Sequence, residues 1–237
     1  MKLSAPIFRL KRRARLLARD TGTPLNQALD RIAEAEGFAG WSLLAAHHAR
    51  LSPSQAILSR LEDGDLLLLA GRPGQGKTVL GLQLLLDAVA EGRRGVFYTL
   101  YMTEGDVAAQ LGRLGADASV YADKLSVVAS DDICAAYIAH DLQGAAPGTL
   151  AVIDYLQILD QPRQTPELAE QVRALQAFAR AQGVVLAFLS QVSRAYDPEA
   201  KPLPDMDDLH LPNRIDTGAF SKTCFLHNGD IRFAAML

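Results

Sequence analysis

The stretch Gly71-Arg72-Pro73-Gly74-Gln75-Gly76-Lys77-Thr78 decides the fold of this chain. It fits the pattern G-x-x-x-x-G-K-T, in which glycines let backbone N–H groups approach phosphates closely. The apolar run 66–70 before it indicates a buried strand, and the run that begins at Val79 indicates a helix. A phosphate-binding loop between a strand and a helix is therefore predicted, and such a loop binds a nucleoside triphosphate.

The polar residues of this loop have distinct predicted roles. Lys77 is expected to reach the β- and γ-phosphates as a positive charge, and the Thr78 hydroxyl to coordinate Mg²⁺. The alternative, a chance match in an ordinary loop, is disfavoured by the flanking strand and helix. The predicted contacts to the nucleotide are Gly71, Gly74, Gln75, Gly76, Lys77, Thr78 and Val79.

Length and composition limit the class of protein. A chain of 237 residues can hold one α/β domain and a small appendage. No apolar stretch approaches the roughly 18 residues of a membrane span, which predicts a soluble, cytoplasmic protein. The net charge of −3 gives no overall attraction to nucleic acid, so any such binding needs a local basic patch.

Residues 1–51 are predicted to form a small helical unit. Apolar residues recur at helical spacing around Leu10 and again from Leu25 to Ala33, with Thr23 expected to cap the second helix, and a third helix is expected at 41–51. The first helix is basic, which indicates either a contact with nucleic acid or an acidic partner, or a solvated face. Its basic residues are Lys11, Arg12, Arg13, Arg15 and Arg19.

Residues 52–237 are predicted to form the phosphate-binding domain. Beyond the loop, strands and helices alternate, which predicts an α/β fold with a mostly parallel sheet covered by helices on both faces. Asn228-Gly229, between two apolar segments near the end, predicts a β-hairpin. The expected strands are 95–100, 124–129, 149–153 and 184–190, and the expected helices are 104–114, 131–142 and 166–181.

Ligands of such folds bind at the carboxyl ends of the parallel strands. Gln75, Asp154 and Gln191 are all predicted at such ends. Asp154 follows four apolar residues and is expected to hold Mg²⁺ through a water molecule, with a helix cap or turn residue as the alternative.

Three segments together resemble the ATPase domain of DnaB-type replicative helicases. They are the phosphate loop with Ala70, the segment Ile153-Asp154-Tyr155-Leu156-Gln157, and Ser190-Gln191-Val192-Ser193-Arg194, in the order that this family shows. The resemblance covers about residues 61–223. It implies a RecA-like fold, ATP and Mg²⁺ as cofactors, ATP hydrolysis, and Gln191 as a sensor of the γ-phosphate.

The sequence also departs from that family. Where the family has a glutamate that orients the attacking water, this chain has Tyr101, and a tyrosine cannot serve as a carboxylate base at neutral pH. Glu104 is a candidate substitute, and the alternative is a first-turn helix acid after a Thr103 cap. The arginine finger of the family has no clear counterpart, and Arg214 and Arg232 are candidates or ordinary surface charges.

The long segment 192–217 corresponds to the region where the helicases contact DNA. It has six acidic and three basic residues, which disfavours phosphate contact, and its prolines predict an ordered excursion. The leading hypothesis is a slow Mg²⁺-dependent ATPase, with homo-oligomers and DNA as further candidate partners. The second hypothesis is a nucleotide-dependent binding or regulatory module with little turnover, and strand separation is the third.

Overall fold

The computed structural model describes residues 3–5, 7–49, 51–116, 121, 123–160, 166–210 and 215–235. It divides the chain into two compact units, Met1–Leu61 and Glu62–Leu237. The boundary expected from the sequence at residue 52 stays a prediction. None of the helices in the described ranges is long and apolar enough to cross a membrane.

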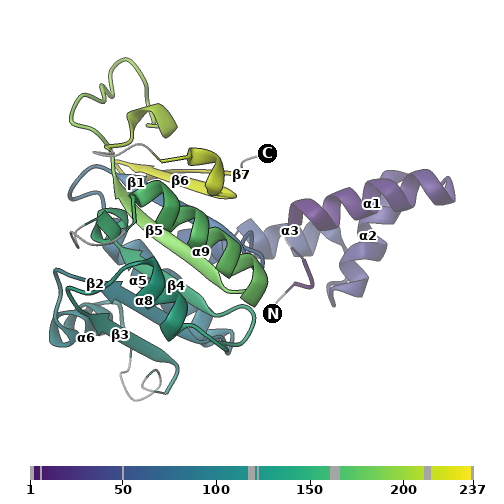
Figure 1. The fold of residues 1–237 in the computed structure, drawn as a ribbon. Coiled ribbons are helices and arrows are strands. Elements are labelled where there is room, and N and C mark those ends of the chain that lie inside the picture. Colours follow the sequence, from purple (N-terminus) through teal and green to yellow (C-terminus); the bar gives the residue numbers. More distant parts are fainter. Residues whose placement is uncertain are drawn as a thin grey trace. The chain divides into compact units, whose positions relative to one another are not determined.

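The first unit is helical. Its core contains Leu10, Ala33 and Leu44, one from each of the first three helices, with Trp41 packed against them. Asp30 accepts a hydrogen bond from the backbone N–H of Trp41 at 2.8 Å and so joins the second helix to the start of the third. The helices are α1 (Ile7–Thr21), α2 (Leu25–Ala35), α3 (Trp41–Ala49) and α4 (Pro53–Leu58) (Figure 1).

Two helix starts in this unit differ in how they are capped. Ser52 caps α4 with its hydroxyl and forms a capping box with Gln55. The Thr23 cap is wrong, because Pro24 occupies the N-cap of α2 in an extended conformation and Thr23 lies one residue too early. The Thr23 hydroxyl instead lies 2.7 Å from that of Thr21.

The second unit contains a seven-stranded sheet in the order β3-β2-β4-β5-β1-β6-β7. Neighbouring strands are parallel except for the antiparallel pair β6 and β7. This arrangement confirms the predicted α/β fold with a RecA-like, mostly parallel sheet. The strands are β1 (Leu66–Gly71), β2 (Gly95–Thr99), β3 (Leu125–Ala129), β4 (Leu150–Asp154), β5 (Val185–Gln191), β6 (Lys222–His227) and β7 (Asp230–Ala235).

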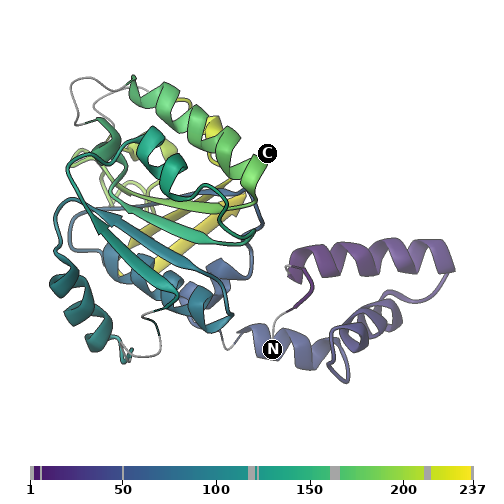
Figure 2. The ribbon, with the colours of Figure 1, turned by 60° about the horizontal axis from the view of Figure 1, so that its bottom comes forward.

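Helices cover both faces of this sheet (Figure 2). On one face Ile138 of α8 and Leu175 of α9 belong to the same buried cluster as Leu68 of β1. On the other face α5 lies so close that a Cβ added at Gly81 would come within 3.1 Å of Val152. The helices are α5 (Lys77–Ala90), α6 (Glu104–Arg113), α8 (Ala135–Asp141) and α9 (Leu168–Gln182), each within or close to its predicted range.

The predicted hairpin is confirmed at the end of the chain. Asn228 and Gly229 connect β6 to β7 with φ angles of 48° and 88°. Positive φ at both central residues is what a two-residue turn between twisted antiparallel strands requires. Asparagine and glycine adopt this conformation at the lowest steric cost.

We predict that the buried hydrogen bond between Tyr98 of β2 and Asp141 of α8 holds this helix on the sheet. The two oxygens are 2.5 Å apart and the Tyr98 side chain is fully buried. Tyr98→Phe should lower the free energy of unfolding of the second unit by about 1.5–3 kcal/mol, because the acceptor is a carboxylate. Urea unfolding followed by circular dichroism measures this loss.

Tyr137→Phe is the matched control, since no hydrogen bond of its hydroxyl is found among the described residues. Trp41, the single tryptophan, lies in the first unit, so its fluorescence transition should not move with either change. Equal stability of the Tyr98 and Tyr137 variants would contradict the assignment.

Candidate functional site

The predicted site residues lie at the carboxyl ends of adjacent strands. β4, β5 and β1 are neighbours in the sheet and end at Asp154, Gln191 and Gly71. Gly71 pairs in register with Gln191, and Asp154 pairs with Thr99 of β2. The phosphate loop, the strand-end acid and the Ser-Gln segment are therefore together at one edge of the sheet.

The loop between β1 and α5 has the backbone of an anion site. Gly74 and Gly76 have φ angles of 80° and 81°, and a Cβ on either would meet no atom within 4 Å. Gly76 is the N-cap of α5 and gives that helix no side-chain cap. The first N–H groups of the 14-residue helix thus have no capping side chain, and an anion can take that place.

A glycine is required at position 71 for a different structural reason from the glycines at positions 74 and 76. A Cβ at this position would come within 3.0 Å of the Leu226 carbonyl oxygen on β6. The absence of a side chain therefore permits the close approach of β6 to the end of β1. Its predicted contact with the nucleotide stays a prediction.

Thr78 and Asp154 form the central polar pair of the site. The Thr78 hydroxyl donates a hydrogen bond of 2.7 Å to Asp154 Oδ2, which joins the first turn of α5 to the end of β4. Lys77 Nζ donates at 3.0 Å to the carbonyl oxygen of Arg72 in the loop. Two oxygen ligands and one ammonium group thus lie next to the uncapped start of the helix.

Partial burial makes the charges of Asp154 and Lys77 costly. Desolvation raises the pKa of Asp154 above its usual value, against the opposing effects of the Thr78 hydrogen bond and the Lys77 charge. Desolvation also lowers the pKa of Lys77, although the nearby Asp154 opposes the shift. Titratable groups whose pKa values are shifted by burial and by a neighbouring charge are common at functional sites.

Two contacts of the phosphate loop were not predicted from the sequence. The Gln75 side-chain carbonyl accepts a hydrogen bond of 2.6 Å from the backbone N–H of Asn228, so the β6–β7 turn holds the loop. The Arg72 guanidinium donates to the Arg194 carbonyl oxygen at 2.8 Å and lies 5.7 Å from the centre of the Tyr196 ring. The loop is thus anchored on both sides by segments that follow β5 and β6.

The position of the missing glutamate is occupied by an aromatic pair. Tyr101, after β2, stacks on Tyr155, which directly follows Asp154, with ring centres 5.5 Å apart and hydroxyl oxygens 3.4 Å apart. The hydrogen bond with Tyr101, together with burial, raises the pKa of Tyr155 to about 12. Its hydroxyl therefore keeps its proton at neutral pH.

Glu104 is the first residue of α6 and is exposed. The Thr103 cap that its alternative interpretation requires is confirmed, since Thr103 and Asp106 form a capping box. A catalytic role of Glu104 stays a prediction. Of the two finger candidates, Arg232 is exposed on β7, and Arg214 lies outside the described residues.

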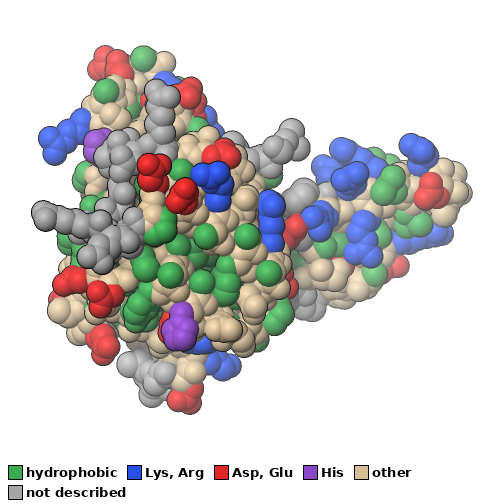
Figure 3. Space-filling view, in the orientation of Figure 1, with side chains coloured by type: hydrophobic (Ala, Val, Ile, Leu, Met, Phe, Trp, Pro, Cys, Tyr) green, Lys and Arg blue, Asp and Glu red, His purple; other side chains and the backbone are tan. Residues whose placement is uncertain are grey.

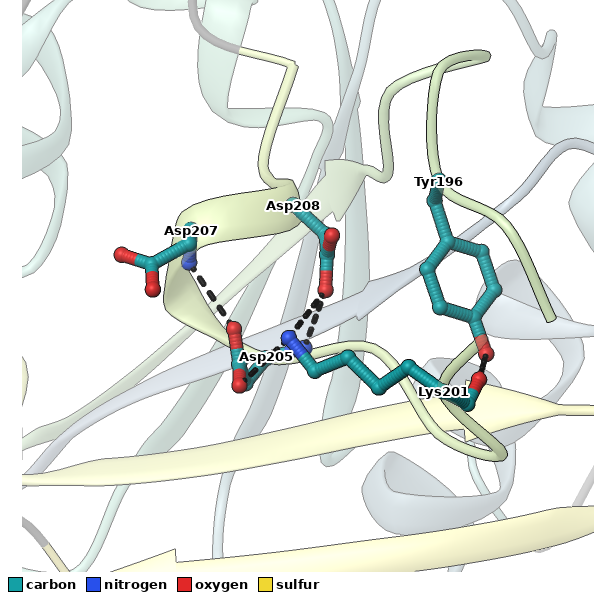
Figure 4. Close-up of polar contacts among 5 residues, drawn as sticks. All are labelled: Tyr196, Lys201, Asp205, Asp207 and Asp208. Carbon is teal, nitrogen blue, oxygen red and sulfur yellow. Dashed lines mark hydrogen bonds and ion pairs between the residues drawn. The ribbon is translucent and has the colours of Figure 1, made fainter. Parts of the chain in front are cut away.

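The described part of the segment after β5, residues 192–210, makes several internal contacts, and the predicted order of the whole segment stays a prediction. Val192 and Leu209 form an antiparallel bridge at its base, and the buried Tyr196 donates to the Lys201 carbonyl oxygen at 2.7 Å. Figure 4 shows Lys201 between Asp205 and Asp208, with Nζ–O distances of 2.5 and 2.8 Å. A basic residue of this segment is therefore neutralised within the segment itself.

The residues present fit a magnesium–nucleotide complex. Mg²⁺ prefers hard oxygen ligands and keeps several waters, and Thr78 with Asp154 supplies two neighbouring oxygens. Phosphates prefer backbone N–H groups and a positive charge, which the start of α5 and Lys77 supply.

Comparisons with solved structures agree with this fold. An ATPase domain of G40P superposes with a TM-score of 0.58 at 17% identity, over 79% of this chain and 81% of that one. A DnaB-like replicative helicase, described with its interactions with primase, superposes with a TM-score of 0.61 at 15% identity, over 94% of this chain and 65% of that one. A KaiC-like protein from Pyrococcus horikoshii OT3 superposes with a TM-score of 0.54 at 19% identity, over 74% of this chain and 78% of that one.

Sequence comparisons find replicative DnaB helicases as relatives. The protein of Geobacillus stearothermophilus is 26% identical over 208 residues, and that of Synechocystis sp. is 24% identical over 185 residues. The matches cover 73% and 65% of this chain, but it spans only 45% and 21% of the lengths of those helicases. The resemblance to the DnaB-type ATPase domain is thereby confirmed.

The family comparison covers most of the chain. Residues 29–202, more than half of the 237 residues, match the family described as "ATPase: KaiC". Together with the RecA-like sheet and the phosphate loop at its edge, this match shows that the chain belongs to the KaiC ATPase family.

Proposed function

We propose that this chain binds ATP with Mg²⁺ and hydrolyses it slowly when alone. The observation that carries the proposal is the 2.7 Å bond between Thr78 and Asp154, directly beside the uncapped N-terminus of α5. Bound Mg²⁺ would neutralise charge on the transferred phosphate. Thr78 would be its direct ligand, and Asp154 would hold one of its waters.

In this proposal the loop residues have separate roles. Backbone N–H groups from Gly74 to Val79 surround the phosphates, and Lys77 turns from the Arg72 carbonyl to the β- and γ-phosphates. Gln75 holds the loop through Asn228 and so fixes the position of these donors. Gln191, at the end of β5, contacts the γ-phosphate and so senses its presence.

A second candidate function rests on the Tyr101–Tyr155 pair. Neither phenol supplies a carboxylate, so the residue that orients the attacking water is missing at its usual place, with Glu104 as the nearest substitute in sequence. Loss of a general base typically removes about 10²–10⁴ in rate. A module that binds nucleotide to order its loops, with little turnover, fits this pair.

Partners of the relatives give further proposals. One structural neighbour is described with primase, and the sequence relatives are replicative helicases. We propose a homo-oligomer, in which a neighbouring subunit can supply an arginine finger, and DNA as a candidate partner. The acidic segment after β5 gives no support to a helicase-type DNA contact, and the cytoplasmic location stays a prediction.

We predict that Lys77→Ala weakens nucleotide binding at least tenfold, because the phosphates lose a charge-assisted contact of about 1.5–3 kcal/mol. Titration with a fluorescent ATP analogue in the presence of Mg²⁺ measures the change. The control is Lys124→Ala, an exposed lysine just before β3. Equal affinity of wild type and the Lys77 variant would end the proposal.

We predict that Asp154→Asn stabilises the nucleotide-free protein at pH 7, with a melting temperature higher by on the order of 2–4 °C. Because the folded-state pKa of Asp154 is raised, ionisation at neutral pH destabilises the folded form, and the uncharged amide avoids this cost. The advantage should vanish as pH falls through the folded-state pKa towards about 3.9, since wild-type Asp154 is then protonated.

Thermal melts across this pH range measure the effect, with the exposed Asp123→Asn as control. With saturating Mg²⁺ and ATP the order should reverse, because only wild type holds the metal well. If Asp154→Asn is less stable than wild type at pH 7 without nucleotide, the proposed cost of the Asp154 charge is disproved.

We predict that Tyr101→Glu raises the rate of ATP hydrolysis by about 10²-fold or more if the missing base limits turnover. Phosphate release under single-turnover conditions measures it. Glutamine has nearly the same size as glutamate but no charge, so the Tyr101→Gln variant should not hydrolyse ATP faster than wild type. Fast hydrolysis by wild type that Asp154→Ala abolishes would exclude the low-turnover alternative.

A further inference from the structure

Charge is distributed very unevenly along this chain. Helix α1 has six arginine and lysine residues and one aspartate, a net charge of +5. The whole chain has −3, so all other residues together have −8. A protein with no overall attraction to polyanions therefore contains one strongly basic helix.

Four of these basic residues form a continuous ridge. Lys11, Arg12, Arg15 and Arg19, called here the basic ridge, lie at spacings of three and four residues. With 3.6 residues per turn, they fall within about 100° of the helix circumference. All four side chains are exposed, and blue side chains gather over α1 in Figure 3.

The ridge lacks the internal compensation that solvated helix faces usually have. Among the described residues, no ion pair involves any of the four, and the first turn of α1 has no acid. Lys11 and Arg15, and Arg15 and Arg19, are like charges at a spacing of four, which destabilises a helix by about 0.2–0.5 kcal/mol per pair. The pattern is unfavourable for the isolated helix and favourable only next to negative charge.

We propose that the basic ridge of α1 binds the phosphate backbone of a nucleic acid. Three of the four residues are arginines, whose planar guanidinium groups hold phosphate oxygens with two hydrogen bonds. Consecutive residues of the Lys11–Arg15–Arg19 row rise by about 6 Å along the helix. The row can therefore follow a strand of phosphates, and the contact is independent of base sequence.

The apolar side of α1 favours this partner over a membrane surface. A helix that lies in a lipid interface needs its apolar face for the lipid. In α1 the central apolar residues Leu10 and Ala14 are fully buried within the protein. Among the described residues of α1, Leu16 is the one large apolar side chain that is well exposed, at 49%, so the surface left for a partner is mainly charged.

The test measures binding of the full chain to a labelled DNA single strand and its duplex, each about twenty nucleotides long, by fluorescence anisotropy across a salt series without ATP. The ridge variant is Lys11→Gln, Arg12→Gln, Arg15→Gln and Arg19→Gln. We expect at least tenfold weaker binding. For the duplex, the slope of log K against log salt concentration should become shallower by about 3.6, because four phosphate contacts no longer release counterions. Because no nucleotide is present, the result is independent of the proposed ATPase function.

The control variant removes the same charge from exposed sites on the other unit, by Arg113→Gln, Lys124→Gln, Arg173→Gln and Arg180→Gln, and should bind within twofold of wild type. A variant with lysine at positions 12, 15 and 19 keeps the charge and should retain most of the binding, which separates charge loss from misfolding. The proposal fails if ridge and control variants bind alike. It also fails if anionic phospholipid vesicles or polyglutamate compete as strongly as unlabelled DNA.

Discussion

One constraint governs the candidate site, the partial burial of the Asp154 and Lys77 charges beside the uncapped start of α5. In the absence of a ligand, the Thr78 hydroxyl and the Arg72 carbonyl oxygen take the hydrogen bonds of these two groups. Both partners are weaker than Mg²⁺ and phosphate, so the folded chain keeps a pair of charges whose desolvation is only partly offset. This arrangement supports the proposal of a magnesium nucleotide as the ligand, because such a ligand brings both a cation and an anion to the site.

Local patterns predicted most of the fold, because strands and helices follow from periodicity and turn residues that act over a few positions. The buried run of β1, the glycines before α5 and the Asn228-Gly229 turn are of this kind. The contacts that hold the phosphate loop are different. Gln75 meets Asn228, and Arg72 meets Arg194, across 153 and 122 residues of sequence. No periodicity within one element encodes such pairs. The Thr23 cap failed for a local reason, because the neighbouring Pro24 is itself the N-cap residue of α2.

The Tyr101–Tyr155 pair shows why a motif predicts binding more securely than turnover. Binding of phosphates depends on backbone N–H groups and on one ammonium group, which the loop presents whatever follows β2. Hydrolysis depends in addition on a base beside the γ-phosphate, and here Tyr101 stands at that position in the sequence and stacks on Tyr155, the residue after Asp154. Sequence alone revealed the loss of the glutamate, but not that Tyr155 would stack on its replacement.

The distribution of charge bears on how a nucleic acid could be engaged. In the second unit, the segment after β5 is acidic, and its Lys201 is paired with Asp205 and Asp208. Phosphate contact there would have to displace those carboxylates, which repel it as well. In the first unit the exposed ridge of α1 has no such competitor among the described residues. In these proposals, nucleic acid binds to the first unit and ATP to the second. An effect of ATP on DNA affinity would then require coupling between the units and would not follow from the ATP site alone.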